Sequence, residues 1–160
     1  MTTKLHISLV GGQAAPVYQG IIHANPDKVI LIHSEGTLEQ AERIKAEIVN
    51  EVELVQFSPV NLLEIYSKLK EIKSHINKDI ILSINVSSGT KPWSIVFYKE
   101  FIDRENTTIF YIDQNAVLWD LKTSKTCSVK FDMHAQFRLY GNPLTDFTDF
   151  NSFTEQDFKI

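Results

Sequence analysis

Residues 79–101 read DIILSINVSSGTKPWSIVFYKEF and hold a strand, a turn and a helix in direct succession. The run at 79–86 is rich in apolar residues, which predicts a strand that is covered on both faces. The following residues, 87–92, are polar and include a glycine and a proline, which are typical of a turn. Beyond the turn, helical spacing relates three large side chains, Trp93, Phe97 and Phe101. The stretch therefore predicts one strand–loop–helix unit of a parallel sheet.

The same alternation extends along the chain on both sides of this unit. Apolar runs at 5–10, 28–33, 52–57 and 107–112 predict four further strands. Helical patterns separate these runs, and the first helix is expected to begin near Pro16. The alternation predicts an α/β fold with a doubly wound, Rossmann-like parallel sheet, helices on both faces and the strand order 3-2-1-4-5.

A C-terminal β-hairpin is expected as an addition to this sheet. Residues 116–121 and 126–131 both alternate between apolar and polar positions. One apolar face of the hairpin is expected to hold Val117, Trp119, Leu121, Val129 and Phe131. Cys127, the one cysteine of the chain, is expected to be a packed strand residue.

Composition disfavours several classes of function. The chain has 160 residues, 43% of them hydrophobic, and a net charge of −4, so we expect one domain without direct DNA binding. It has neither CxxC nor HExxH, so we expect no metal site. It has neither a P-loop nor GxGxxG, and no cofactor is expected. We recognise no signal peptide and no membrane-spanning stretch, so we expect a cytoplasmic protein without membrane contact.

Two loops of unusual composition follow the first and fourth predicted strands. They are GGQAAP at 11–16 and SSGTKP at 87–92. In the order 3-2-1-4-5 these strands are neighbours, and ligands bind at such a reversal of strand order. Glycines and helix starts present backbone amides to an anion, Lys91 adds a cation, and Gln13 can read a base or a ribose. The loops therefore predict a phosphate and nucleoside site, although each alone is also compatible with a simple turn.

Four stretches resemble the CRISPR-associated Rossmann-fold (CARF) domain. They are LVGGQAAP, PDKVILIHSEGTLEQAERIKAEI, NVSSGTKPW and FYIDQN, and the resemblance covers about residues 4–140. It is greatest to ancillary nucleases in which a restriction-endonuclease-like domain follows the CARF domain. The resemblance implies a ligand-sensing CARF domain at 1–131, including the hairpin at 116–131. Residues 132–160 are expected to be an irregular tail or the start of a missing effector module.

The resemblance also implies a function. A homodimer would bind a cyclic oligoadenylate, with cyclic tetra-adenylate favoured, as the sensor of a type III CRISPR antiviral response, with a fused or separate nuclease as effector. In the family pattern, Gly12 and Gln13 would line the ring, and residues 88–91 would contact its phosphates and riboses. His33, at the end of the second strand, is the one histidine expected near this crevice. The candidate ligand-binding residues are Gly11, Gly12, Gln13, Pro16, His33, Ser87, Ser88, Gly89, Thr90 and Lys91.

One departure from the family pattern leaves an alternative open. The usual loop reads Thr-Gly-Gly-Thr-Lys, whereas residues 87–91 read SSGTK, so Ser88 places a hydroxyl where the family has a glycine. A metal-independent ring nuclease that cleaves the messenger remains an alternative, with Ser88 and Lys91 as its catalytic candidates. A DNA-binding transcription regulator is disfavoured, because residues 132–160 are acidic and rich in phenylalanine.

Overall fold

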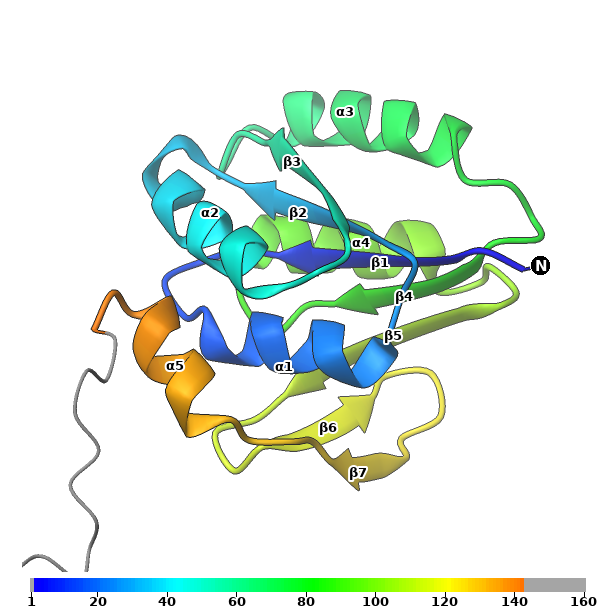
Figure 1. Cartoon of the computed structure of the whole chain (residues 1–160). Coiled ribbons are helices and arrows are strands. Elements are labelled where there is room, and N and C mark those ends of the chain that lie inside the picture. Colours follow the sequence, from blue (N-terminus) through cyan, green and yellow to red (C-terminus); the bar gives the residue numbers. More distant parts are fainter. Residues whose placement is uncertain (1, 143–160) are drawn as a thin grey trace, which may run out of the picture.

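A mixed sheet with the strand order β3-β2-β1-β4-β5-β6-β7 forms the centre of the protein (Figure 1). The computed structural model describes residues 2–142. Five of the strands are parallel: β1 (Lys4–Leu9), β2 (Lys28–His33), β3 (Glu51–Gln56), β4 (Ile81–Asn85) and β5 (Thr107–Ile112). The predicted α/β class and the order 3-2-1-4-5 are therefore confirmed.

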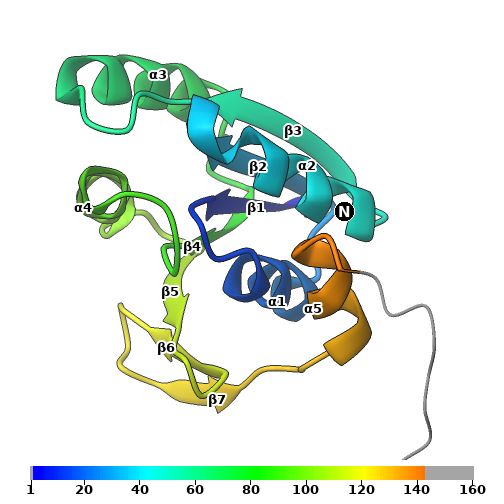
Figure 2. The same cartoon turned by 90° about the vertical axis from the view of Figure 1, so that its left-hand side faces the viewer.

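Helices cover both faces of the sheet (Figure 2). Two of them, α3 (Leu62–Ser74) and α4 (Lys91–Phe101), lie on one face. The opposite face is covered by α1 (Ala15–Ala24), α2 (Leu38–Glu47) and α5 (Met133–Leu139), with the short 3-10 helix η1 (Glu35–Thr37) preceding α2. In the part of the chain that the structure describes, no helix is long and apolar enough to cross a membrane.

Each face of the sheet has its own apolar core. On the α3–α4 side, Trp93 and Phe97 pack against Ile84 and are fully buried. On the α1–α2 side, Val17 and Ile44 pack against Leu31. Alternate residues of the central strands enter the two cores, which explains why these strands are apolar on both faces.

The hairpin is present, but its apolar face differs from the expectation. Its strands are β6 (Val117–Asp120) and β7 (Thr126–Ser128), and β6 pairs antiparallel with β5. Leu118, opposite Ile112, is buried with Phe110 and Val129, whereas Trp119 is exposed. Cys127 is also exposed rather than packed.

Helix α5 replaces the irregular segment that was expected from residue 132 onward. The Asp132 side chain caps it by accepting a hydrogen bond from the Ala135 amide at 3.0 Å. Leu139 is buried in the α1–α2 core, and Arg138 pairs with Glu47 of α2 at 2.9 Å. The chain therefore packs against the domain beyond residue 131, and the rest of the predicted tail, 143–160, lies outside the described residues.

Candidate functional site

The two loops singled out in the sequence touch each other at the edge where β1 and β4 end. The Gly11 amide donates a hydrogen bond to Ser88 Oγ at 3.0 Å. A Cβ atom on Gly11 would lie 2.6 Å from the Gly89 nitrogen and 2.8 Å from Ser88 Oγ. Only a glycine at position 11 allows this close approach, which occurs at the reversal of strand order where α/β sheets bind ligands.

The remaining glycines of the loops serve different purposes. Gly89 has a φ of 83°, and a Cβ there would lie 2.8 Å from Leu9 Cβ and 2.9 Å from the Trp93 ring. Position 89 therefore requires glycine both for its conformation and for its packing. Gly12 is exposed, a Cβ there would meet no atom within 4 Å, and the neighbouring Gln13 is exposed as well. Gly12 and Gln13 thus form the accessible part of the first loop.

Asn85, the last residue of β4, fixes the second loop to its neighbours. Its buried side chain donates from Nδ2 to the Pro16 carbonyl at 2.9 Å, and Oδ1 accepts from the Ser87 amide at 2.9 Å and from the Ser87 hydroxyl. Ser87 Oγ in turn accepts from the Ile112 amide at 2.7 Å. The protein therefore uses the Ser87 hydroxyl both as donor and as acceptor. Helix α1 can approach Asn85 this closely because position 20 is glycine, where a Cβ would collide with Asn85 Nδ2.

Two helix N-termini and one lysine face this edge. Thr90 is the N-cap of α4 and accepts from the Trp93 amide at 3.4 Å, and Lys91 is the first residue of the helix and is exposed. Helix α1 begins after Ala14, which supplies no side-chain cap, and neither helix has an acidic residue in its first turn. The amides at the start of α1, which have no side-chain cap, the two positive helix ends and Lys91 make this edge suited to an anion.

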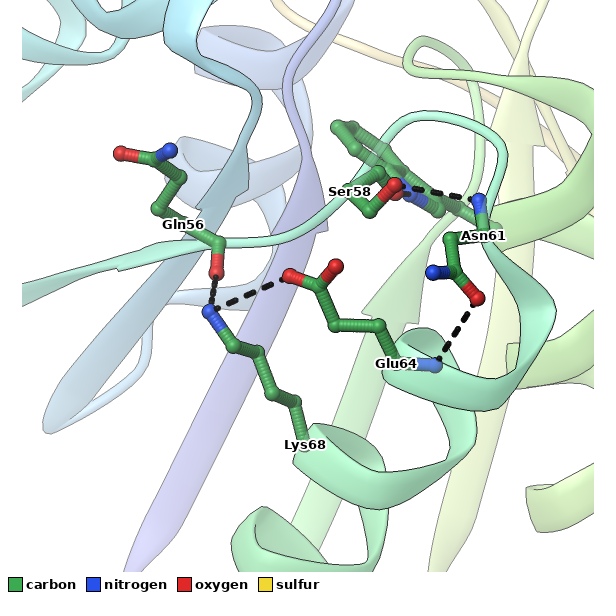
Figure 3. Close-up of polar contacts among 6 residues, drawn as sticks. Gln56, Ser58, Asn61, Glu64 and Lys68 are labelled. Atoms are coloured by element: carbon green, nitrogen blue, oxygen red, sulfur yellow. Dashed lines mark hydrogen bonds and ion pairs between the residues drawn. The ribbon is translucent and has the colours of Figure 1, made fainter.

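A third loop, at residues 57–61, is attached to the start of α4, and Figure 3 shows the contacts of its Ser58 and Asn61 with α3 and with each other. Trp93 Nε1 donates to the Ser58 carbonyl at 2.7 Å, and Ser58 Oγ accepts from the Asn61 amide at 3.0 Å. Lys68 donates to the Gln56 carbonyl at 2.6 Å and pairs with Glu64. The start of α4 is therefore held by the loop that precedes α3.

His33 lies at the end of β2, as predicted, but its side chain is buried and only 4% exposed. Its Nδ1 donates to the Ser34 carbonyl at 2.9 Å. The adjoining η1 is tied to the first loop, because Thr37 Oγ1 donates to the Val10 carbonyl at 3.1 Å. The structure therefore places His33 beneath this edge rather than on its accessible surface with Gln13.

A cavity of about 680 Å³ lies away from the two loops, between α3 and the strands β1, β2 and β3. Both lysines in its wall are already paired, Lys28 with Glu51 at 3.1 Å and with Glu53 at 3.2 Å, and Lys68 with Glu64. The hydrogen bonds that Lys28 donates to the carboxylates of Glu51 and Glu53 raise the pKa of Lys28. For an anionic ligand we therefore favour the two loops over this cavity.

The fold and the loops together define a class: Rossmann-like domains that present amides, hydroxyls and a lysine at the carboxyl edge of the sheet. The profile of the Card1 CARF domain family matches residues 5–140, and the chain belongs to this family. A search among curated proteins finds no match.

Solved structures share the fold. Can2 from Sulfobacillus thermosulfidooxidans in complex with cyclic tetra-adenylate superposes with a TM-score of 0.75 and 20% identity, over 86% of this chain and 41% of Can2. A type III CRISPR defence DNA nuclease activated by cyclic oligoadenylate superposes with a TM-score of 0.72 and 22% identity, over 84% of this chain and 23% of the nuclease. Protein VC1899 from Vibrio cholerae superposes with a TM-score of 0.69 and 14% identity, over 86% of this chain and 39% of VC1899. The chain thus spans less than half of each of these proteins.

Proposed function

We propose that this protein binds a cyclic oligoadenylate, with cyclic tetra-adenylate favoured, between two copies of the chain, and so acts as a sensor of the type III CRISPR antiviral response. One observation carries the proposal: the loops after β1 and β4 meet at the carboxyl edge of a CARF domain, with Lys91 at the start of α4. Can2, which shares the fold, is bound to cyclic tetra-adenylate.

The chemistry of the edge suits such a ligand. Each phosphate of the ring is an anion, and helix-start amides and Lys91 stabilise negative charge. The exposed Gln13 can recognise a base edge or a ribose hydroxyl. A two-fold axis through the dimer would present each loop twice to a ring of repeated nucleotides. The net charge of −4 is then no obstacle, because the anion site is local.

Thermal unfolding in the presence of cyclic tri-, tetra- and hexa-adenylate tests the proposal directly. A ligand at a hundredfold excess over its dissociation constant stabilises the folded protein by about 2.7 kcal/mol. We expect the largest shift with the tetra-adenylate, and no shift with any ring would contradict the proposal. Chromatography of the recovered ligand tests the ring-nuclease alternative, since an intact ring is expected from a sensor.

Lys91→Ala is expected to weaken binding strongly. A charge-assisted contact to phosphate contributes about 1.5–3 kcal/mol, and a dimer loses two such contacts. Titration calorimetry of the variant measures the loss, and Lys45→Ala, which removes an exposed lysine of α2, is the matched control. Equal affinity of both variants and the unmodified protein would show that Lys91 is a solvated helix-start residue.

We propose that the domain acts in the cytoplasm and passes its signal to a nuclease effector, fused or separate. A nuclease activated by cyclic oligoadenylate shares the fold of this chain, which supports that arrangement.

A further inference from the structure

The two loops of the candidate site contain no aromatic side chain. They read GGQAAP at 11–16 and SSGTKP at 87–92, and Trp93, the first aromatic residue after the second loop, is 0% exposed. Amides, hydroxyls and Lys91 suit phosphates and riboses, and Gln13 can read the edge of a base. A base also has two flat faces, which proteins commonly cover with aromatic rings. A ligand that carries bases is therefore expected to contact a further surface near this edge.

Tyr111 of β5 and Trp119 of β6 form an exposed aromatic pair on the sheet. They are opposite each other in the antiparallel pairing, with ring centroids 6.3 Å apart and ring planes within 6°. This spacing is that of offset-stacked rings, in which each ring leaves part of its face uncovered. The two residues are 36% and 38% exposed, whereas Phe110, which points to the other face of the sheet, is 2% exposed. The pair therefore presents aromatic surface to solvent.

Tyr111 is adjacent to the start of the second loop. The Val86 amide donates to the carbonyl of the residue before Tyr111 at 2.9 Å, and the amide of the residue after Tyr111 donates to Ser87 Oγ at 2.7 Å. Neighbouring strands lie about 4.7–4.9 Å apart, so Tyr111 is one strand spacing from β4 and Trp119 is two. Both side chains lie on the same sheet face as Ile109, which packs in the α3–α4 core. The pair thus lies beside the loop, on the face of the sheet where α4 begins.

Asp113 holds the Trp119 ring in place. Its Oδ2 accepts from Trp119 Nε1 at 3.0 Å, while Oδ1 accepts from the Asn115 amide at 2.8 Å and from the Val117 amide at 3.1 Å. The bond from Trp119, which is the largest cause, and the bond from Val117 lower the pKa of Asp113. The one polar group of the indole is thus engaged within the chain, and its flat face remains available. A ring that is already held in place loses little conformational entropy when a ligand binds.

Other exposed aromatic residues do not lie at this edge of the sheet. Among residues 2–142 they are found on or beside α3, α4 and α5, namely Tyr66, Tyr98, Phe131, Phe137 and Tyr140. Tyr66 also has Lys99 over its ring, with Nζ 5.9 Å from the ring centroid. Within the described part of the chain, Tyr111 and Trp119 are therefore the exposed aromatic residues that belong to strands.

We propose that Tyr111 and Trp119 form the stacking surface for an adenine base of the bound ligand, while the two loops hold its phosphates and riboses. The inference rests on the proposed function and deepens it, because it assigns base recognition to residues outside both loops. In a nucleotide the base and the phosphate are attached to different positions of the ribose. A surface for the base is therefore expected beside the phosphate-binding loops rather than within them. Stacking on an aromatic ring favours binding, because the flat faces of ring and base leave water together.

The variants Trp119→Leu and Trp119→Phe test the stacking. Leucine keeps an apolar side chain but has no flat ring, whereas phenylalanine keeps a ring. In titration calorimetry we expect Trp119→Leu to raise the dissociation constant for cyclic tetra-adenylate about tenfold or more, and Trp119→Phe to change it by no more than about threefold. Phe131→Leu, which removes an exposed ring between β7 and α5, is the matched control and should leave the affinity unchanged.

Tryptophan emission gives a second readout of the same contact. The chain has two tryptophans, and Trp93 is 0% exposed, so Trp119 is the one that a base can reach. We expect cyclic tetra-adenylate to quench the emission of the unmodified protein, because a stacked base quenches indole fluorescence. The quenching should be absent from Trp119→Leu even at saturating ligand. Quenching that Trp119→Leu retains in full would overturn the proposal.

Light scattering without ligand separates base stacking from a contact between subunits. We expect Trp119→Leu to have the same oligomeric state as the unmodified protein, since leucine retains most of the apolar character of the position. A variant with a different oligomeric state would assign the pair to subunit contact and overturn its role in stacking. Circular dichroism of each variant verifies that it is folded.

Failure of the stacking role and failure of the proposed function give different results. An unmodified protein that binds no cyclic oligoadenylate would contradict the proposed function, and the stacking role with it. Binding of cyclic tetra-adenylate with equal affinity by the unmodified protein and by Trp119→Leu would support the proposed function and overturn the stacking role alone.

Discussion

Ser88 illustrates how one side chain joins the two loops and still has a proton to donate. Its oxygen accepts the Gly11 amide at 3.0 Å, and a hydroxyl that accepts a hydrogen bond becomes a better donor. We expect Ser88→Ala to weaken cyclic oligoadenylate binding by about 0.5–1.5 kcal/mol, the contribution of one neutral hydrogen bond. Ser88→Thr keeps the hydroxyl and should restore most of the affinity, as measured by titration calorimetry.

Two other results for Ser88→Ala would change the role that we assign to Ser88. Unchanged affinity together with a lower melting temperature would mean that Ser88 serves only to hold the loops together. Ligand cleavage by the unmodified protein that is lost in the variant, at equal affinity, would favour the ring-nuclease alternative.

The position of neighbouring Ser87 could be predicted from the sequence, but its hydrogen-bond partners could not. The apolar run followed by a polar turn correctly placed Ser87 in the loop just after β4, beside the reversal of strand order. It did not reveal that Ile112, 25 residues away, donates to its hydroxyl. Asn85 was not singled out at all, although an amide that ends an apolar strand was a usable signal. Hydrogen bonds between distant segments are a property of the folded chain, and spacing along the sequence does not encode them.

The contact between the two loops can be tested with a matched pair of glycine variants. A Cβ on Gly11 would collide with the backbone of the other loop, whereas a Cβ on Gly12 would meet nothing. We expect Gly11→Ala to lower the free energy of unfolding by about 1–3 kcal/mol, since the loops must move apart. Gly12→Ala should change it by no more than about 0.5 kcal/mol. Urea denaturation of both variants measures this difference, and equal stability would contradict the loop contact.

Gly12→Ala also tests the expected contact between Gly12 and the ring. Its fold should be intact, so a loss of affinity for cyclic tetra-adenylate would report on the ligand alone. Unchanged affinity would mean that the ring lies elsewhere along this edge.

Most elements were predictable because their patterns were periodic and long. The five parallel strands and their order followed from apolar runs that alternate with helical stripes. The face of the hairpin was wrong because residues 117–119 are all apolar, so alternation alone does not fix the phase. Pairing of Leu118 with Ile112 of β5 decides it. Helix α5 was missed because it is short and is stabilised by packing on α2, which local pattern does not show.

The free energy of unfolding of the protein should depend on pH through His6. Its ring is fully buried and hydrogen-bonds Ser83 Oγ at 2.7 Å and Ser8 Oγ at 2.8 Å. Burial first, and then the charge of His23, lower its pKa from 6.5 to about 3. The unfolded chain therefore binds a proton below pH 6.5 that the folded chain accepts only near pH 3. The buried, neutral His6 therefore leaves the free energy of unfolding undiminished above pH 6.5, and this free energy decreases as the pH falls from 6.5 toward 3.

Urea denaturation at pH 7 and pH 5 measures this effect. We expect His6 to account for about 2 kcal/mol of the stability lost between these two pH values. His6→Gln should lack this part of the loss, while His75→Gln, which changes an exposed histidine, should retain it. The same loss in His6→Gln and in the unmodified protein would show that His6 is not the group that takes up the proton.

Gly20 and Asn85 also constrain how this sequence can change over evolutionary time. Any side chain at position 20 collides with Asn85 Nδ2, while Asn85 holds the start of α1 through the Pro16 carbonyl. A lineage that acquires alanine at position 20 first must either turn the Asn85 side chain aside, which breaks its bond to the Pro16 carbonyl, or push α1 away from the sheet. A lineage that first acquires a smaller residue at position 85 opens the space but gives up the bond to Pro16. The order in which the two substitutions arise therefore decides which intermediates are viable, and substitutions at the two positions are expected to be historically contingent on each other.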